Sequence, residues 1–172
     1  MTDNDKLGAV FFDRDGVLNE DTSYLYKISD FRWIKGAKDA LRAVQDAGLL
    51  SIVVTNQSGI GRGYFKEQDV NLLHKWMRHE LSKEGVSIAD FYICPFHEDA
   101  VVPRYKVVNH PDRKPNPGMI LRAIQEWNLD PHKSFIVGDK ESDLIAGHRA
   151  GIKGVIYQGG DLSLLIRSLL EM

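Results

Sequence analysis

Short apolar runs alternate with longer amphipathic stretches along this chain, and this alternation restricts the possible folds more than any other feature of the sequence. Five apolar runs have the length of buried strands: residues 9–12, 51–55, 91–94, 134–138 and 154–157. Helical spacing of apolar side chains, or capping residues, predicts helices over five further stretches: residues 38–47, 67–84, 116–127, 141–150 and 162–170. Strands that alternate with helices form a parallel sheet covered by helices. We therefore predict an α/β fold with a Rossmann-like open parallel sheet and helices on both faces, in a single domain over residues 1–172.

Two segments interrupt the alternation, and each follows an apolar run. They cover residues 19–35 and 95–115. Long segments without periodicity are usually functional or mobile in compact domains. In open α/β sheets, ligands bind at the edge where the strands end. We expect both insertions to help form a binding site at this edge.

Charge and composition argue against several classes of protein. The 22 Lys and Arg residues and the 24 Asp and Glu residues give a net charge of −2, which provides no broad basic surface for nucleic acids or membranes. Residues 1–6 lack the pattern of a signal peptide, and no apolar run approaches the roughly 18 residues of a membrane span. A single cysteine, Cys94, suits a reducing compartment. We predict a cytoplasmic, monomeric protein without nucleic-acid or membrane partners.

Four groups of polar residues fall where apolar runs end or within the second insertion. They are Asp13-Arg14-Asp15-Gly16, Thr55-Asn56-Gln57-Ser58-Gly59, Arg113-Lys114-Pro115 and Gly138-Asp139-Lys140-Glu141-Ser142-Asp143. Each group alone has an ordinary explanation, such as a solvated turn, an exposed cation pair or a helix N-cap. Their agreement in position is a stronger signal than any one of them.

Together these residues suit phosphoryl transfer with a carboxylate nucleophile. Mg²⁺ prefers oxygen ligands, which Asp13 and Asp139 can provide. Mg²⁺ and Lys114 would remove the repulsion between a carboxylate and a phosphate dianion. An aspartate could then attack phosphorus to form an aspartyl-phosphate. A second carboxyl group, for which Asp15 is placed, could protonate the leaving oxygen and later deprotonate water.

The four groups, in this order, resemble the four motifs of the haloacid dehalogenase (HAD) superfamily of phosphotransferases, over about residues 8–157. The resemblance implies that Asp13 is the nucleophile and Asp15 the general acid and base. It implies that Thr55 and Lys114 bind the phosphate. The metal ligands would be Asp13, Asp139 and the backbone carbonyl of Asp15, with Asp143 orienting the water shell of the Mg²⁺.

A narrower resemblance is to the branch of heptose bisphosphate and histidinol-phosphate phosphatases, which lack a large cap domain. It implies a small phosphorylated metabolite as substrate, bound by Asn56, Gln57, Arg62, Arg113 and Lys140. We take a heptose bisphosphate as the first choice and histidinol phosphate as the alternative. The amine of histidinol phosphate would need a carboxylate partner, which could be Glu20, Asp21 or Glu98.

The chain departs from this branch at one place. The branch commonly holds a structural zinc on a Cys-x-His and a Cys-x-Cys pair, and here Phe96 stands where the first pair has histidine. Phenylalanine cannot bind a metal, and tetrahedral zinc sites need four donors. We therefore expect no structural zinc. A mixed site stays open as the alternative, on Cys94, His97, His110 and Asp112.

A signalling receiver domain uses similar parts, because it also carries an acidic pair, a phosphorylated aspartate, a threonine and a lysine. The acid two residues after the proposed nucleophile, Asp15, argues against this reading, since it supplies a base for hydrolysis of the intermediate. The two insertions argue against it as well.

Overall fold

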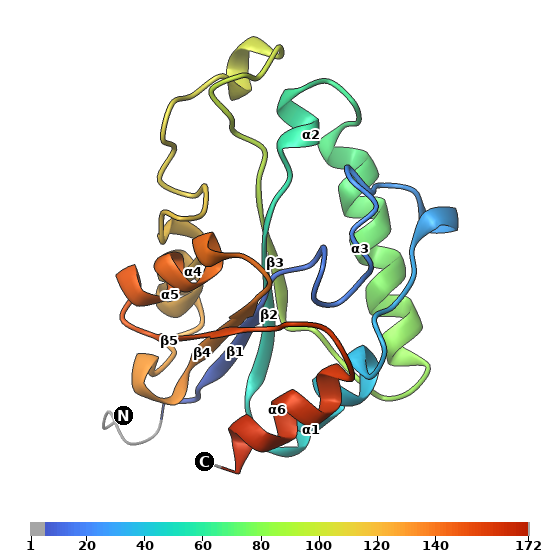
Figure 1. The fold of residues 1–172 in the computed structure, drawn as a ribbon, viewed down its shortest axis with the longest axis vertical. Coiled ribbons are helices and arrows are strands. Elements are labelled where there is room, and N and C mark those ends of the chain that lie inside the picture. The colour runs from blue at the N-terminus through green and yellow to red at the C-terminus, as the bar shows by residue number, and fades with distance from the viewer. Residues whose placement is uncertain (1–5, 172) are drawn as a thin grey trace.

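Five parallel strands form one sheet in this computed structural model, which describes residues 6–171 and confirms the predicted α/β fold. The strands are β1 (Ala9–Phe12), β2 (Leu50–Asn56), β3 (Asp90–Cys94), β4 (Phe135–Gly138) and β5 (Lys153–Ile156). Their order across the sheet is β3-β2-β1-β4-β5, with β1 in the centre (Figure 1). Residues 1–5 and 172, at the ends of the predicted domain, lie outside the described residues. The chain leaves β1 toward β2 and β3 and later returns to β1's other side, so the strand order reverses next to β1. Ligands bind at such reversal points.

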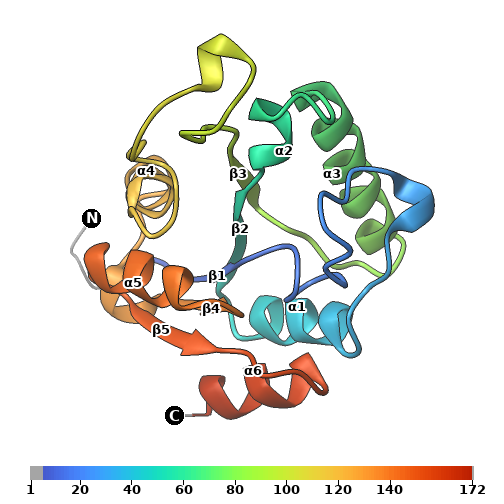
Figure 2. The same ribbon diagram turned by 45° about the horizontal axis from the view of Figure 1, so that its top comes forward.

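Helices cover both faces of the sheet, as Figure 2 shows. On one face lie α1 (Ala37–Asp46), α3 (Glu67–Ser82) and α6 (Leu162–Leu170), and on the other lie α4 (Gly118–Glu126) and α5 (Glu141–Arg149). Side chains alternate along a strand. Accordingly, Val10 and Phe12 of β1 pack toward the first group of helices, while Ala9 and Phe11 pack toward the second. Two separate apolar cores therefore hold β1 in place.

The predicted helices form nearly where the sequence pattern puts them. In α1, Ala40, Leu41 and Val44 are buried on one face, and burying a leucine side chain contributes about 1.5–3 kcal/mol. Gly48 follows the helix with a φ of 74°, a left-handed conformation in which glycine is the least strained residue.

The start of α4 differs from the prediction. The sequence pattern predicts a helix from residue 116, but α4 begins at Gly118 and its preceding residue, Pro117, makes no side-chain cap. Asn116 Nδ2 instead donates to Asn109 Oδ1 at 2.8 Å and to the His110 carbonyl at 2.9 Å. Its amide therefore closes the end of the second insertion, because a loop of this length needs partners for its own backbone.

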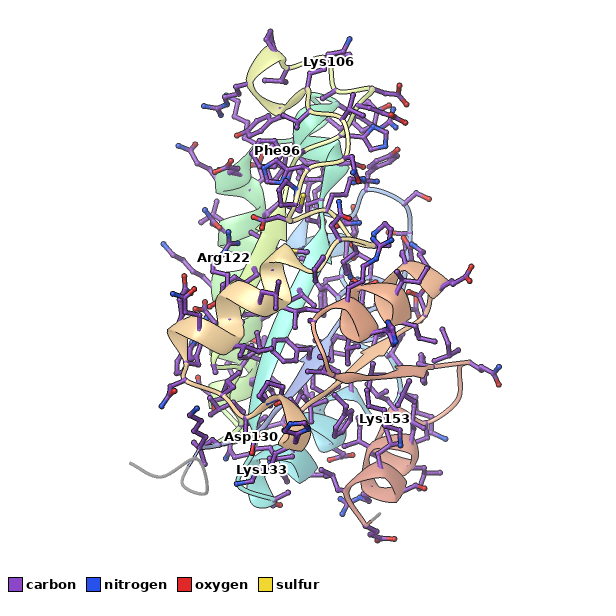
Figure 3. The ribbon with its side chains drawn as sticks, turned by 90° about the vertical axis from the view of Figure 1, so that its left-hand side faces the viewer. Phe96, Lys106, Arg122, Asp130, Lys133 and Lys153 are labelled. Carbon is purple, nitrogen blue, oxygen red and sulfur yellow. The ribbon has the colours of Figure 1, made fainter. Side chains whose placement is uncertain are left out.

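Both insertions are anchored by apolar side chains. Leu25 and Phe31 of the first insertion are buried in the core beneath α3. Ala100 and Tyr105 of the second pack into a small core with residues around α2 (Ser58–Gly61), a short helix that the sequence pattern does not predict. Figure 3 shows how far the second insertion extends, with Phe96 and Lys106 labelled beyond the N-terminal end of α4. Within residues 6–171, no helix combines the length and the apolar character needed to span a bilayer.

Candidate active site

The carboxyl edge of the sheet brings together acidic residues and one buried lysine. Asp13 follows β1, and its backbone N–H donates to the Val137 carbonyl of β4 at 3.1 Å. Lys114 Nζ lies 3.0 Å from Asp13 Oδ1 and 2.6 Å from Asp143 Oδ1. It also donates to the Val54 carbonyl at 2.8 Å. All three charged side chains are buried, so this edge holds one ammonium between two carboxylates.

Burial and charge act against each other in this cluster. Burial raises the pKa of Asp13 to about 7, although the Lys114 ammonium counteracts the shift. Burial alone would lower the pKa of Lys114, but Asp13 and Asp143 outweigh it and hold that pKa above its usual value. Lys114 therefore remains a cation. An additional positive charge beside Asp13 would favour the carboxylate form of this residue.

Asn56 connects the second insertion to the end of β2. Its Nδ2 donates to the Lys114 carbonyl, and its Oδ1 accepts from the Lys114 backbone N–H, each at 3.1 Å. This pair of hydrogen bonds sets the position from which the Lys114 side chain enters the edge. Asn56 was expected to bind substrate, and it does line the cavity described below, but its amide is directed at the backbone of Lys114.

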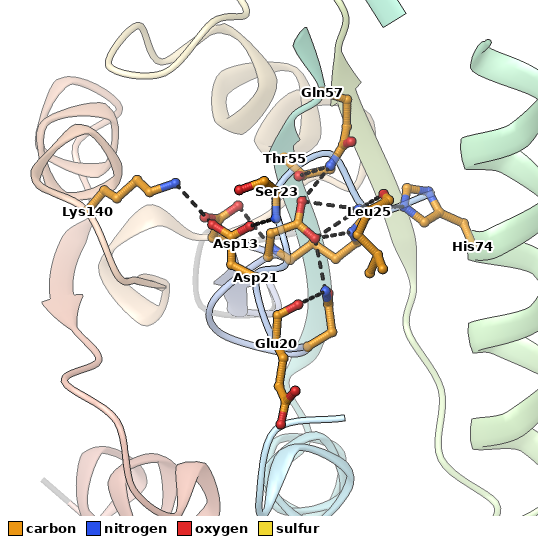
Figure 4. A network of polar contacts seen from close by, with 12 residues as sticks. Asp13, Glu20, Asp21, Ser23, Leu25, Thr55, Gln57, His74 and Lys140 are labelled. Carbon is orange, nitrogen blue, oxygen red and sulfur yellow. Dashed lines mark hydrogen bonds and ion pairs between the residues drawn. The ribbon is translucent and has the colours of Figure 1, made fainter. Parts of the chain in front are cut away.

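Gln57 connects two of the predicted catalytic side chains. Its Nε2 lies within 2.9 Å of both Asp15 Oδ2 and Thr55 Oγ1. Asp15 Oδ1 accepts a further hydrogen bond from Asn19 Nδ2 at 2.9 Å. Figure 4 shows this network of polar contacts at the ends of the strands. Gln57, Thr55 and Asp15 are among the site residues predicted from the sequence. Asn19 is not, because no spacing rule distinguishes it from other loop asparagines.

Three carboxylates form a donor set for a cation. One oxygen each from Asp13, Asp139 and Asp143 lie within 4.8 Å of one another. The two oxygens of Asp143 already accept from Lys114 Nζ and from the Lys140 backbone N–H. Asp139 Oδ1, by contrast, is buried without a hydrogen-bond partner among residues 6–171. Such an orphaned carboxylate oxygen suits a hard cation like Mg²⁺.

Gly16 keeps the space beside Asp139 open. Its φ is 87°, and a Cβ atom on it would lie 2.3 Å from Asp139 Oδ2. Glycine is therefore needed here for two reasons, the left-handed backbone and the close approach of the carboxylate.

A cavity of about 260 Å³ opens over Asp13. Its wall also contains Asp15, Asn56, Gln57, Lys114, Lys140 and Asp143. At its rim, Lys140 Nζ lies 3.8 Å from Asp21 Oδ2, and this pair is visible in Figure 4. Most of the predicted site residues therefore border one space.

Arg62 and Arg113 lie elsewhere. Arg113 lines a second cavity of about 220 Å³ with His97 and Glu98, and this cavity shares Lys114 with the first. Arg113 Nη1 donates to the Phe96 carbonyl at 3.3 Å. Arg62 Nη2 lies 3.4 Å from His97 Nε2. The structure thus separates two arginines near the second cavity from the acids of the first.

An aromatic pair joins the two ends of the second insertion. The rings of Phe96 and His110 are stacked with centroids 3.7 Å apart and an interplanar angle of 5°. His110 Nδ1 accepts from the Asp112 backbone N–H at 3.0 Å. Asp112 Oδ2 lies 2.8 Å from Nη1 of Arg122 on α4, which Figure 3 labels. Phe96 thus has a packing role of its own.

Cys94, His97, His110 and Asp112 do not form a close donor set among residues 6–171, and the absence of a structural zinc stays a prediction. Cys94 is buried, and burial raises the pKa of its thiol to about 11. Among residues 6–171, three ligand atoms from His, Cys, Asp or Glu come within 4.8 Å only at the acidic set above. The side chains of Asp112 and His110 are engaged in the contacts just described.

Comparison with known proteins gives consistent matches. A family model described as HAD-hydrolase-like matches residues 112–164. A D-glycero-alpha-D-manno-heptose-1,7-bisphosphate 7-phosphatase from Burkholderia mallei is 48% identical, covering 86% of this chain and 77% of its own. A D-glycero-beta-D-manno-heptose-1,7-bisphosphate 7-phosphatase from Rhodopseudomonas palustris is 40% identical, covering 94% and 89%.

Two solved structures resemble the whole fold. A putative HAD-like phosphatase from Mesorhizobium loti has a TM-score of 0.86 at 36% identity, covering 96% of this chain and 85% of its own. A D,D-heptose 1,7-bisphosphate phosphatase from B. bronchiseptica, complexed with magnesium and phosphate, has a TM-score of 0.84 at 26% identity, covering 96% and 99%.

Proposed function

The chain belongs to the HAD superfamily of phosphatases, and from this membership we propose that it removes the 7-phosphate from a heptose 1,7-bisphosphate, with Mg²⁺ as cofactor. The relatives named above support the proposed substrate. The buried contact between Asp13 and Lys114 at the end of the central strand supports the proposed reaction. We further infer that the enzyme acts as a cytoplasmic monomer.

The metal proposal rests on the closeness of the Asp13, Asp139 and Asp143 carboxylates and on Asp139 Oδ1, which is buried without a hydrogen-bond partner among residues 6–171. Asp13, Asp139 and the backbone carbonyl of Asp15 would hold Mg²⁺. Asp143, whose two oxygens are already hydrogen-bonded, would orient the ion's water ligands. Bound there, Mg²⁺ supplies positive charge that offsets the repulsion between the nucleophile and the phosphate.

The first half of the reaction transfers the phosphoryl group to the enzyme. A carboxylate oxygen of Asp13 attacks phosphorus, and the bond from phosphorus to the sugar oxygen breaks. Asp15, in its acid form, gives its proton to that leaving oxygen. Lys114 and Thr55 bind the phosphate oxygens during this step, so that charge is stabilised as it shifts.

The second half releases inorganic phosphate. Asp15, now a carboxylate, takes a proton from a water molecule that attacks phosphorus. The bond between phosphorus and Asp13 breaks, which restores the nucleophile and returns Asp15 to its acid form. Gln57, which contacts both Asp15 and Thr55, keeps the base and the phosphate ligand together.

The two neighbouring cavities support a substrate with two phosphates. The first, over Asp13, would hold the phosphate that is cleaved, with Lys140 and Gln57 near the sugar. The second, lined by Arg113 and close to Arg62 through His97, would hold the phosphate that stays. Guanidinium groups suit phosphate because they can donate two parallel hydrogen bonds.

A substrate panel tests this proposal. The purified enzyme with Mg²⁺ is given the α and β anomers of D-glycero-D-manno-heptose 1,7-bisphosphate and histidinol phosphate, and phosphate release is followed. We expect kcat/KM for one heptose anomer to exceed that for histidinol phosphate at least about tenfold, which is about 1.4 kcal/mol. The relatives carry the names of both anomers, so the panel also decides between these.

Asp13→Asn is the matched control, because the amide has nearly the same shape but no nucleophilic charge. It should show no turnover while its circular dichroism and melting temperature stay close to those of the wild type. Preference for histidinol phosphate would refute the substrate proposal. Release of only one equivalent of phosphate per chain would refute the enzyme proposal in favour of a receiver domain.

A further inference from the structure

A buried arginine and a buried histidine form a pair behind the active site that the mechanism above does not use. Arg14 stands between the two catalytic acids and is fully buried, and His74 of α3 is also buried. Arg14 Nη1 lies 3.1 Å from His74 Nε2. Figure 4 shows His74 reaching from its helix toward this network. Two such polar side chains in a core require a reason, because burying them is costly unless they are paired.

The Nε and Nη2 side of the Arg14 guanidinium binds the Asp15 carboxylate. Arg14 Nε and Nη2 donate to Asp15 Oδ1 at 3.2 and 2.9 Å, and Nη2 also lies 3.1 Å from Oδ2. A further hydrogen bond joins Nη2 to the Leu25 carbonyl at 2.8 Å. A planar guanidinium that contacts both oxygens of a carboxylate fixes the plane of that carboxylate as well as its position.

These contacts distinguish the two oxygens of Asp15. Oδ1 accepts from Arg14 Nε, Arg14 Nη2 and Asn19 Nδ2. Oδ2 accepts from Gln57 Nε2 and, at longer range, from Arg14 Nη2. With Oδ1 occupied by three donors, Oδ2 is the oxygen better able to take up and give away a proton.

His74 can act only as an acceptor toward Arg14, because a guanidinium has no acceptor atom. Its Nε2 must therefore be unprotonated, which places the ring hydrogen on Nδ1. The ring is stacked on Phe91 of β3, with centroids 4.2 Å apart and an angle of 19°. Burial, Arg14 and Arg78 all lower the pKa of His74, in agreement with a neutral ring. A neutral acceptor held by stacking fixes the far end of the guanidinium.

We propose that His74 is a positioning residue for the general acid and base, which accepts a hydrogen bond from Arg14 and so holds the Arg14 guanidinium that orients Asp15. The proposal rests on the role of Asp15 in the proposed function. His74 touches neither the substrate cavity nor the reacting atoms, and it acts through Arg14 alone.

Leaving groups of different quality separate this role from a structural one. A sugar oxygen is a poor leaving group that needs a proton from the general acid, whereas p-nitrophenolate leaves readily without one. The ratio kcat/KM covers the steps up to departure of the leaving group. A defect in the position of Asp15 must therefore reduce kcat/KM for a sugar phosphate far more than for p-nitrophenyl phosphate. A defect in overall structure reduces both alike.

The decisive variant is His74→Phe, which keeps a ring on Phe91 but removes the acceptor. With the best sugar phosphate of the panel, kcat/KM should fall about ten- to a hundredfold, and with p-nitrophenyl phosphate less than about threefold. His74→Gln restores an acceptor at similar reach and should return the ratio of the two values to within about threefold of the wild type. His79→Phe, on an exposed position of the same helix, is the control and should change neither value.

Asp15→Asn serves as the reference. If it shows the selective loss and His74→Phe does not, the inference about His74 is overturned while the role of Asp15 stands. If Asp15→Asn shows no selective loss, the proposed role of Asp15 fails and the inference falls with it. Equal losses on both substrates in His74→Phe would also overturn the inference. Should His74→Phe fail to fold, His74→Asn replaces it, because its shorter side chain cannot reach Arg14, and it must show the selective loss that His74→Gln lacks.

Discussion

At the scale of single residues, the adjacent cations Arg113 and Lys114 lie in different surroundings. Lys114 Nζ lies against Asp13 and Asp143 in the first cavity. Arg113 lines the second cavity and donates to the Phe96 carbonyl. The two residues lie in a turn, and the hydrogen bonds of Asn56 to the Lys114 backbone hold the position from which the Lys114 side chain reaches Asp13. We therefore expect the two cations to affect different kinetic properties.

Replacing Arg113 should change substrate choice. Arg113→Ala is expected to weaken the discrimination between a heptose bisphosphate and a simple sugar monophosphate by about 1–3 kcal/mol, the loss expected for charge-assisted hydrogen bonds. Arg113→Lys keeps the charge without the planar guanidinium and should recover only part of this discrimination.

Lys114→Ala should lower kcat on every substrate alike, because it removes charge at the reacting centre. The measurement is kcat/KM across the panel. Constant ratios in Arg113→Ala with altered ratios in Lys114→Ala would show that the two assignments are reversed.

At the scale of elements, the second insertion is held by contacts of several kinds. The Phe96–His110 stack joins its two ends, Asp112 pairs with Arg122 of α4, and Tyr105 packs into the small core around α2. All of these contacts are formed by protein side chains, so the stability of the insertion should not depend on a metal.

A chelator tests that expectation. EDTA should abolish turnover, and Mg²⁺ in excess should restore it, because the acidic set needs a cation. The melting temperature of the EDTA-treated protein should stay within about 2 °C of the untreated one, and metal analysis should find well under one equivalent of zinc. As a comparison, His110→Ala should lower the melting temperature, because a stacked ring pair is worth about 0.5–1.5 kcal/mol. Stoichiometric zinc whose removal lowers the melting temperature would contradict this account.

The sequence predicted strands and helices well because their patterns are local. The ends of β1, β2 and β4 could be read from apolar runs, and parallel pairing then brought Asp13, Thr55 and Asp139 to one edge. Contacts between side chains distant in sequence were not accessible in this way. Arg14 and His74 are 60 residues apart, and periodicity only placed His74 on a helix, where packing or surface roles are common. The stack of Phe96 on His110 likewise depends on how the insertion folds back, which no local rule specifies.

At the scale of the whole molecule, the buried His74 links stability to pH. The pKa of His74 in the folded protein lies well below the ordinary value of 6.5. Below pH 6.5 the unfolded chain therefore binds a proton at this residue that the folded protein does not bind. Stability is lost progressively as the pH falls from about 6.5 toward the folded-state pKa, by at most about 1.4 kcal/mol per pH unit for one such group.

This contribution can be isolated by a variant that does not titrate. Urea unfolding at pH 7.0, 6.0 and 5.0 should show that the free energy of unfolding falls less steeply in His74→Gln than in the wild type. His79→Gln, at an exposed position of α3, should keep the wild-type slope. The groups other than His74 and His79 are common to all three proteins and cancel in the comparison. Identical slopes in His74→Gln and wild type would show that His74 titrates normally.

Lys114 lines both cavities, so a substrate that spans the two has different surroundings at its two ends. One cavity presents Asp13 to an incoming anion, and the other presents Arg113. A molecule with phosphates at both ends can enter in two orientations, and each orientation exposes a different ester to attack. The chemistry at phosphorus is the same in both orientations. The orientation of the molecule across the two cavities therefore decides which ester is cleaved. We therefore expect the length and the stereochemistry of the carbon chain between the two phosphates to determine which ester is cleaved.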